Sequence, residues 1–196
     1  MGLQMPSISE FFALALEHQQ AGRLSQANKL FRQIICLTPN HPDSLFYLGI
    51  NAHKEGQDDK AIELIQTAIS LYGDAPEYYV SLGNVLQDTG NLDEAINCFV
   101  KAISINPNCW QAQNNLGLVR QDKCEYDKAI FWFEKALLTK PDYSEAMNNL
   151  GVVLQQQGRN DEAINCFRKA VEFEPSNNTA SDNLALALKK TNVLIQ

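Results

Sequence analysis

The sequence predicts an all-α fold, a right-handed superhelical solenoid of repeated helix-turn-helix units, and three observations support this prediction. Two residue patterns recur with a period of 34 residues, as from Ala27 to Ala61 to Ala95, without an insertion between copies. Within each copy, apolar residues return at spacings of three and four, which is typical of amphipathic helices. Glycine and proline recur at the places where these helices must end.

The two patterns assign a pair of helices to every copy. In the first helix, here called helix A, leucine precedes glycine or alanine, and in helix B alanine stands four residues before a large apolar residue. Small residues let the two helices approach closely, so that the large side chains interlock. The helix A positions are Leu14-Ala15, Leu48-Gly49, Leu82-Gly83, Leu116-Gly117, Leu150-Gly151 and Leu184-Ala185, and the helix B positions are Ala27/Phe31, Ala61/Ile65, Ala95/Phe99, Ala129/Phe133 and Ala163/Phe167.

These patterns divide the chain into a leader, five copies, a last single helix and a tail. The last helix is expected to cover the apolar end that a repeat array otherwise exposes. We expect a leader over 1–7, one domain over 8–190 with copies at 8–41, 42–75, 76–109, 110–143 and 144–177 and a capping helix over 178–190, and a tail over 191–196.

The joints between the helices carry their own signals. Gly22, Gly56, Gly90 and Gly158 follow helix A, where a residue with positive φ is needed. Cys124 replaces this glycine in the fourth copy and should adopt positive φ at a cost of about 1 kcal/mol. We expect Asn40, Asn108, Asp142 and Ser176, each directly after a proline, to cap the next helix A. In the fourth copy Gln113 replaces a large apolar residue of helix A, and we expect Trp110 to fill that space.

The 34-residue pattern resembles the tetratricopeptide repeat, with Leu-Gly in helix A, Ala and an aromatic residue in helix B, and a closing Pro. The resemblance covers about residues 8 to 190. Asn-Leu-Gly at Asn115 and Asn149, with Asn-Leu-Ala at Asn183, is similar to the repeat arm of O-GlcNAc transferase-type and Spindly-like glycosyltransferases. In that family the Asn column is a ladder for the substrate protein, and nothing in this sequence corresponds to the catalytic domain. The resemblance implies a free-standing adaptor or the substrate-recruiting region of a larger glycosyltransferase-like enzyme.

Composition and motifs exclude several other functions. With 16 basic and 23 acidic residues, a net charge of −7 and scattered lysines and arginines, the chain is not expected to bind nucleic acid or an anionic membrane. His18, His41 and His53 lie at unrelated places in their copies, and no phosphate loop or nucleophile motif is present. We therefore expect no metal, no cofactor and no enzymatic activity. Five cysteines without a C-x-x-C pair and the lack of a signal peptide predict a cytoplasmic location.

The candidate binding surface is the concave face, which the A helices line in such an array. Its amides can donate to and accept from a peptide backbone of any sequence, and its amino-terminal part is apolar. Since these side chains should face the groove, we expect their removal to leave fold stability nearly unchanged. The expected peptide-binding residues are the amides Asn84, Gln87, Asn114, Asn115, Gln121, Asn148, Asn149, Gln155 and Asn183 and the aromatic residues Phe12, Phe46 and Tyr47.

Two alternatives remain open for this surface. The amides can be solvated filler, and Phe12 and Phe46 can pack under neighbouring helices instead of facing a ligand. The leading hypothesis is a scaffold that binds an extended peptide or a partner helix in the groove. The second is a self-associating module, a homo-oligomer that docks through the apolar amino-terminal face or through Val193-Leu194-Ile195.

Overall fold

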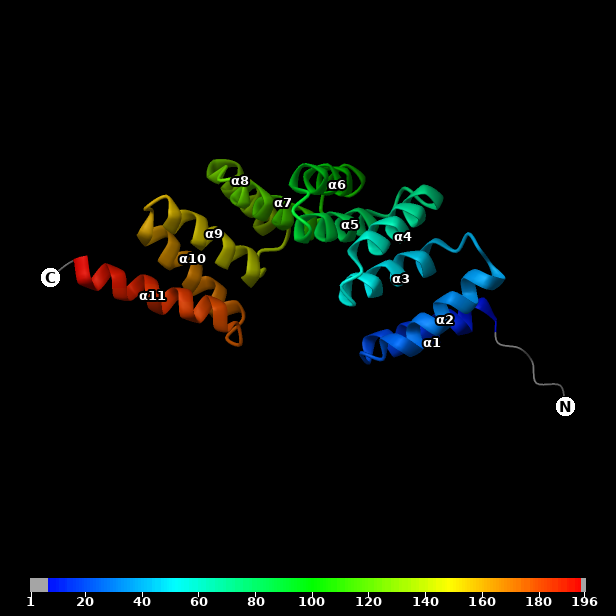
Figure 1. Ribbon diagram of the computed structural model, residues 1–196. Helices are drawn as coiled ribbons and strands as arrows, with labels where there is room; N and C mark the ends of the chain where they lie inside the picture. The colour runs from blue at the N-terminus through cyan, green and yellow to red at the C-terminus, as the bar shows by residue number, and fades with distance from the viewer. Residues whose placement is uncertain (1–6, 195–196) are drawn as a thin grey trace. The chain divides into compact units, whose positions relative to one another are not determined.

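The computed structural model describes residues 7–194, with side chains up to residue 190, as a chain of α-helices (Figure 1). The chain divides into two compact units, Met1–Glu94 (unit 1) and Ala95–Gln196 (unit 2), and each is described by itself. Of the predicted leader, only Ser7 is described, and the side chains of the predicted tail lie outside the described residues. The division into one domain with five copies stays a prediction.

The helices alternate between the A and B positions. Helix α6 (Leu92–Ile105) crosses the division between the units. Unit 1 holds α1 (Ile8–Gln20), α2 (Leu24–Leu37), α3 (Pro42–Lys54), α4 (Asp58–Leu71) and α5 (Pro76–Asp88). Unit 2 holds α7 (Trp110–Asp122), α8 (Tyr126–Thr139), α9 (Ser144–Gln156), α10 (Asn160–Phe173) and α11 (Asn178–Leu194). The all-α repeat fold that the periodicity predicts is confirmed, and the described residues contain no strand.

Consecutive helices pack on one another from α1 to α5 in unit 1 and from α7 to α11 in unit 2, and several successive A helices also touch. Contacts join α1 to α2, α2 to α3, α3 to α4 and α4 to α5 in unit 1, and the A helices α3 and α5 meet there as well. In unit 2, α7 and α9 are in contact, and so are α9 and α11. The A helices α3 and α5 of unit 1, and α7, α9 and α11 of unit 2, therefore lie side by side, and within each of these sets the outward side chains share one face.

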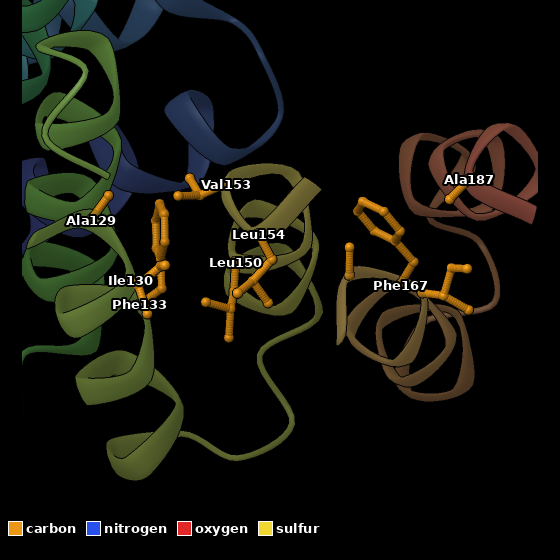
Figure 2. Close-up of a cluster of buried hydrophobic side chains, with 10 residues drawn as sticks. Ala129, Ile130, Phe133, Leu150, Val153, Leu154, Phe167 and Ala187 are labelled. Carbon is orange, nitrogen blue, oxygen red and sulfur yellow. The ribbon is translucent and has the colours of Figure 1, made fainter. Parts of the chain in front are cut away.

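Glycine permits the close approach within a helix pair. A Cβ added at Gly117 would lie 2.6 Å from Cε1 of Phe133, and one added at Gly151 would lie 2.6 Å from Cε1 of Phe167. Both phenylalanines are fully buried. Figure 2 shows Leu150 and Leu154 of α9 between Phe133 of α8 and Phe167 of α10, within one hydrophobic cluster of unit 2. The expected interlocking of small and large residues is confirmed at these contacts.

The joints after helix A have the predicted backbone. Gly22, Gly56, Gly90 and Gly158 have φ between 72° and 80°, and Cys124 has φ 57°. Cys124 is the single non-glycine residue with positive φ in the part of the chain that the structure describes. The replacement of glycine by Cys124 in the fourth copy therefore keeps the loop conformation and holds a residue with a side chain in the left-handed backbone region.

The predicted N-caps of helix A are wrong by one residue. The N-caps of α3, α7 and α9 are His41, Cys109 and Tyr143, and only His41 caps with its side chain, where Nδ1 accepts from the N–H of Ser44. At α11, Oδ1 of Asn177 accepts from the N–H of Ala180. The residue after proline belongs to a turn that precedes each helix, and at the start of α7 the N–H of Asn108 donates to Oδ1 of Asn106 within that turn.

Gln113 fills its own place in the core. It is 5% exposed, its Nε2 donates to the carbonyl of Pro107, and its Oε1 accepts from Oγ1 of Thr139. Trp110 instead lies edge-on to Tyr143, with the ring centroids 4.6 Å apart, and under the Nζ of Lys140. The expectation that Trp110 compensates for Gln113 is therefore wrong, because hydrogen bonds satisfy the buried amide directly.

Helix α11 covers the outer side of the last helix pair. It contacts α9 and α10, and it extends beyond the predicted end at residue 190 to Leu194. Ala187 is buried in the cluster that contains Phe167 (Figure 2). Leu184 and Leu188 pack against the same cluster. The role of α11 as a capping helix stays a prediction.

Candidate functional site

A ladder of asparagine side chains connects the A helices of unit 2. Nδ2 of Asn149 on α9 donates to Oδ1 of Asn114 on α7 at 3.2 Å. Nδ2 of Asn183 on α11 donates to Oδ1 of Asn148 on α9 at 2.8 Å. Asn114 and Asn148 are 0% and 7% exposed. Each rung therefore pairs a buried amide of one A helix with a partly exposed amide of the next.

The rungs leave hydrogen-bonding capacity on their outer side. An asparagine amide has two N–H donors and two acceptor lone pairs, so one bond from Nδ2 leaves Oδ1 and a second N–H. Asn149 and Asn183 are partly exposed, as are Asn115, Gln121 and Gln155 on the same helices. These residues form the surface that we call the amide surface: Asn115, Gln121, Asn149, Gln155 and Asn183.

The ladder changes what the asparagines are expected to do for stability. A buried carbonyl such as Oδ1 of Asn114 loses its partner when Asn149 is truncated, and an unsatisfied buried group costs about 1–3 kcal/mol. From this geometry we expect truncation of Asn149 or Asn183 to lower fold stability, whereas the sequence alone predicts no effect. The sequence carries a signal for this role, since Asn114-Asn115 and Asn148-Asn149 put amides in two neighbouring columns.

Asn114 and Asn148 lie beneath the amide surface. Asn114 donates from Nδ2 to Oδ1 of Asn115 at 3.2 Å as well as accepting from Asn149. Their burial leaves little of either side chain for direct contact with a ligand. Their participation in binding stays a prediction, and the geometry gives them the role of positioning Asn115, Asn149 and Asn183.

The predicted aromatic residues gather on the A helices of unit 1. The ring of Phe12 lies 5.8 Å from that of Phe31 and 5.9 Å from that of Tyr47. Phe46 stacks on Tyr78 at 4.4 Å and is only 7% exposed, whereas Phe12 and Tyr47 are partly exposed. Phe46 therefore packs under a neighbouring helix, as the alternative interpretation expects, while Phe12 and Tyr47 keep exposed surface that a ligand could contact.

Acidic side chains border these rings. The hydroxyl of Tyr78 donates to Oδ1 of Asp43, and burial together with this bond raises the pKa of Tyr78 far above its ordinary value. Burial also raises the pKa of Tyr47, with further contributions from the charges of Asp43 and Glu77. The aromatic face of unit 1 therefore keeps its phenols neutral and carries negative charge.

Asn84 and Gln87 complete the predicted set. They lie on α5 of unit 1, where Asn84 is exposed and Gln87 is partly exposed. The predicted amides therefore form two separate groups, the amide surface in unit 2 and the pair Asn84 and Gln87 in unit 1.

No three or more His, Cys, Asp or Glu side chains among the described residues are grouped to hold a metal ion. No described helix is both long and apolar enough to cross a membrane.

Antiparallel helix pairs stacked at a constant period, with a shared face of A-helix side chains, define a helical repeat protein. Three family models of the tetratricopeptide repeat match the chain, over residues 18–85, 76–109 and 109–174. The chain belongs to the tetratricopeptide repeat family. No curated protein sequence matches it.

Solved structures of repeat proteins resemble the chain over most of its length. A structure of MamA has 26% sequence identity and a TM-score of 0.72, with 91% of this chain and 99% of that chain covered. TTC0263, a protein of Thermus thermophilus, has 24% identity and a TM-score of 0.75, covering 93% and 99%. YrrB, described as a repeat protein with an unusual peptide-binding site, has 17% identity and a TM-score of 0.68, covering 90% and 91%. These similarities agree with the tetratricopeptide repeat fold.

Proposed function

We propose that the chain is a protein-interaction scaffold that binds an extended peptide segment on the amide surface of unit 2. The observation that carries this proposal is the ladder itself, which holds Asn115, Asn149 and Asn183 at fixed positions on α7, α9 and α11. Amides that are held in place lose less conformational freedom when they bind a ligand. Asn149 and Asn183 each keep Oδ1 and a second N–H, which match a peptide backbone because it presents an acceptor and a donor at every residue except proline.

The spacing of the helices supports an extended ligand. Packed helices lie about 8–10 Å apart, and an extended chain rises about 3.3 Å per residue. A peptide that runs across α7, α9 and α11 would therefore meet a new A helix about every three residues. Backbone recognition of this kind predicts binding that is broad in sequence and only weakly dependent on salt.

The test separates binding from the structural role of the ladder. Peptides are selected against the full chain from a random display library, and their affinities are measured by fluorescence anisotropy. Gln121→Ala with Gln155→Ala removes two partly exposed amides that make no ladder bond. Because each net hydrogen bond contributes about 0.5–1.5 kcal/mol, this pair should weaken binding by about tenfold while the melting temperature stays constant.

The matched control is Asn165→Ala, which removes an exposed amide of the B helix α10. It should leave the affinity unchanged. Selected peptides that bind the Gln121/Gln155 variant as tightly as the parent chain would show that the amide surface is not their site.

Self-association stays a second hypothesis, and its tail residues Val193-Leu194-Ile195 lie among those whose side chains are not described. Light scattering over a concentration series measures it directly. The substrate-recruiting role in a larger enzyme likewise stays a prediction.

A further inference from the structure

Two buried asparagines interrupt the apolar pattern of the repeat in unit 1. Asn28 on α2 stands where the other four copies have isoleucine, and Asn51 on α3 stands where the next three have valine. They are 8% and 0% exposed. Buried polar groups in place of apolar packing lower stability unless they are fully bonded. A residue that breaks a consistent local rule is expected at a functional site.

These asparagines form a short hydrogen-bonded chain that ends at the surface. Nδ2 of Asn51 donates to Oδ1 of Asn28 at 2.7 Å, and Nδ2 of Asn28 donates to Oε1 of Glu55 at 3.1 Å. Oδ1 of Asn51 is buried and has no hydrogen-bond partner. One acceptor of this hydrogen-bonded series, Oδ1 of Asn51, is therefore unsatisfied. Packing alone gives no reason for two buried asparagines at these positions.

Asn28 and Glu55 line a pocket of about 380 Å³ between α2, α3 and α4. Pockets that bind ligands generally measure about 300–1,000 Å³ and are mostly apolar with a few polar groups. Here the apolar lining comes from Ile35, Leu45, Leu48, Ala52 and Leu64. The dimensions and the lining both suit an apolar side chain of a partner.

A second hollow adjoins the first along α2. It has a volume of about 610 Å³, shares Arg32 and Cys36 with the first pocket, and adds Phe11 and Leu37. Leu37 is 61% exposed. We call the two hollows together the α2 surface.

Positive charge surrounds the α2 surface. Arg32 and Lys60 line the first pocket, and Lys29 and Arg32 line the second. Within residues 7–190, none of these three cations forms an ion pair. Glu55 is the one carboxylate among the described residues that line the hollows, and its oxygens accept from Asn28 and from Gln57. The surface is thus locally cationic in a chain of net charge −7.

We propose that the α2 surface binds an acidic amphipathic segment of a partner protein. Its apolar side chains enter the two hollows, and its carboxylates pair with Lys29, Arg32 and Lys60. Complementary charge of this kind speeds association and selects among partners. The surface lies in unit 1 and shares no residue with the amide surface of unit 2, so either proposal can fail without the other.

The first experiment uses short labelled peptides and the full chain. One peptide carries two leucines four residues apart, flanked by glutamates, and its matched partner carries lysines in place of the glutamates. We expect the acidic peptide to bind, with an affinity that falls as salt is added, and the lysine peptide to bind at least about tenfold more weakly. Equal binding of the two peptides, or no binding of the acidic one, overturns the proposal.

The second experiment exchanges one charge at two equivalent places. Arg32→Glu should weaken binding of the acidic peptide by about tenfold or more. Arg168→Glu changes the exposed arginine at the same position of the fifth copy, on α10, and should leave the affinity unchanged. Equal losses from the two variants would show that the effect comes from net charge and not from the α2 surface.

The third experiment restores the apolar pattern. Asn28→Ile with Asn51→Val introduces the isoleucine of the other four copies and the valine of the next three, so the variant should keep or raise its melting temperature. The bulkier isoleucine narrows the first hollow and removes the amide that holds Glu55, so the affinity for the acidic peptide should fall. If the folded double variant binds the acidic peptide as tightly as the parent chain, the pocket beside Asn28 is not part of the binding site.

Two cysteines report the site within a single molecule. Cys36 lines both hollows and Cys124 lies in unit 2, and both thiols are exposed. Saturating acidic peptide should slow alkylation of Cys36 and leave that of Cys124 unchanged. Equal protection of the two thiols, or protection of neither, contradicts the assignment.

If the chain alone dimerises and Arg32→Glu makes it monomeric, the occupant is a second copy and the proposed partner is wrong.

Discussion

At the residue scale, Cys124 isolates the cost of one backbone conformation. Its φ of 57° is close to that of the glycines at the equivalent joints, where an added Cβ would meet no atom within 4 Å. The strain therefore comes from the backbone and not from crowding. The side chain is exposed, and its hydrogen bond with Tyr126 raises the pKa of that phenol.

Cys124→Gly should raise the free energy of unfolding by about 0.5–1 kcal/mol, because glycine adopts positive φ without the Cβ penalty. Urea denaturation followed by circular dichroism measures the change. The reverse substitution, Gly158→Ala, should lower the free energy of unfolding by about the same amount. A loss of more than about 1 kcal/mol from Cys124→Gly would mean that the thiol contributes packing or bonding that outweighs the strain.

At the scale of the elements, the asparagine ladder ties each A helix of unit 2 to the next. Apolar packing between a helix A and its own helix B is short-range and follows the 34-residue pattern, as the contact of Gly151 with Phe167 shows. The bonds from Asn149 to Asn114 and from Asn183 to Asn148 instead join helices of successive copies. They add directional contacts where the A helices meet.

Asn149→Ala should lower the free energy of unfolding by about 1–2 kcal/mol relative to Asn165→Ala. Both substitutions gain the same helix propensity, so their difference isolates the lost rung and the unsatisfied carbonyl of Asn114. Thermal unfolding of the two variants in parallel measures this difference. Identical melting temperatures would mean that water replaces the amide at the rung, and the ladder would then be irrelevant to stability.

The sequence predicts the helices far better than it predicts the surfaces. The constant spacing of alanines, glycines and prolines predicts where helices α1 to α11 lie in the sequence, because each helix pair repeats the same packing and the same turns. The ladder requires knowledge of how one copy is offset from the next, which the period alone does not contain. The exchange of isoleucine for Asn28 is visible in the sequence, but the pocket beside it depends on how α2, α3 and α4 pack.

At the scale of the whole molecule, repeated residues build the fold and the varying residues distinguish its surfaces. Ala61, Ala129 and Ala163 are fully buried, as expected of positions that every copy needs. Asn28, Arg32 and Leu37 vary between copies, and they line the hollows of unit 1. An array of this kind can therefore acquire a binding surface on one copy without altering the packing of the others.

The same dependence on neighbours makes the contacts of helix α11 important to the stability of unit 2. Leu184, Ala187 and Leu188 of helix α11 cover the cluster that contains Phe167. A chain that ends at Asn177 should melt at a lower temperature and aggregate on heating, because each large apolar side chain left exposed forfeits about 1.5–3 kcal/mol. A chain that ends at Lys190 keeps these three residues and serves as the control, with a melting temperature close to that of the full chain. Differential scanning fluorimetry with light scattering follows both events in one experiment. Equal melting of the two truncated chains would show that α11 contributes nothing to the stability of the array and is not its cap.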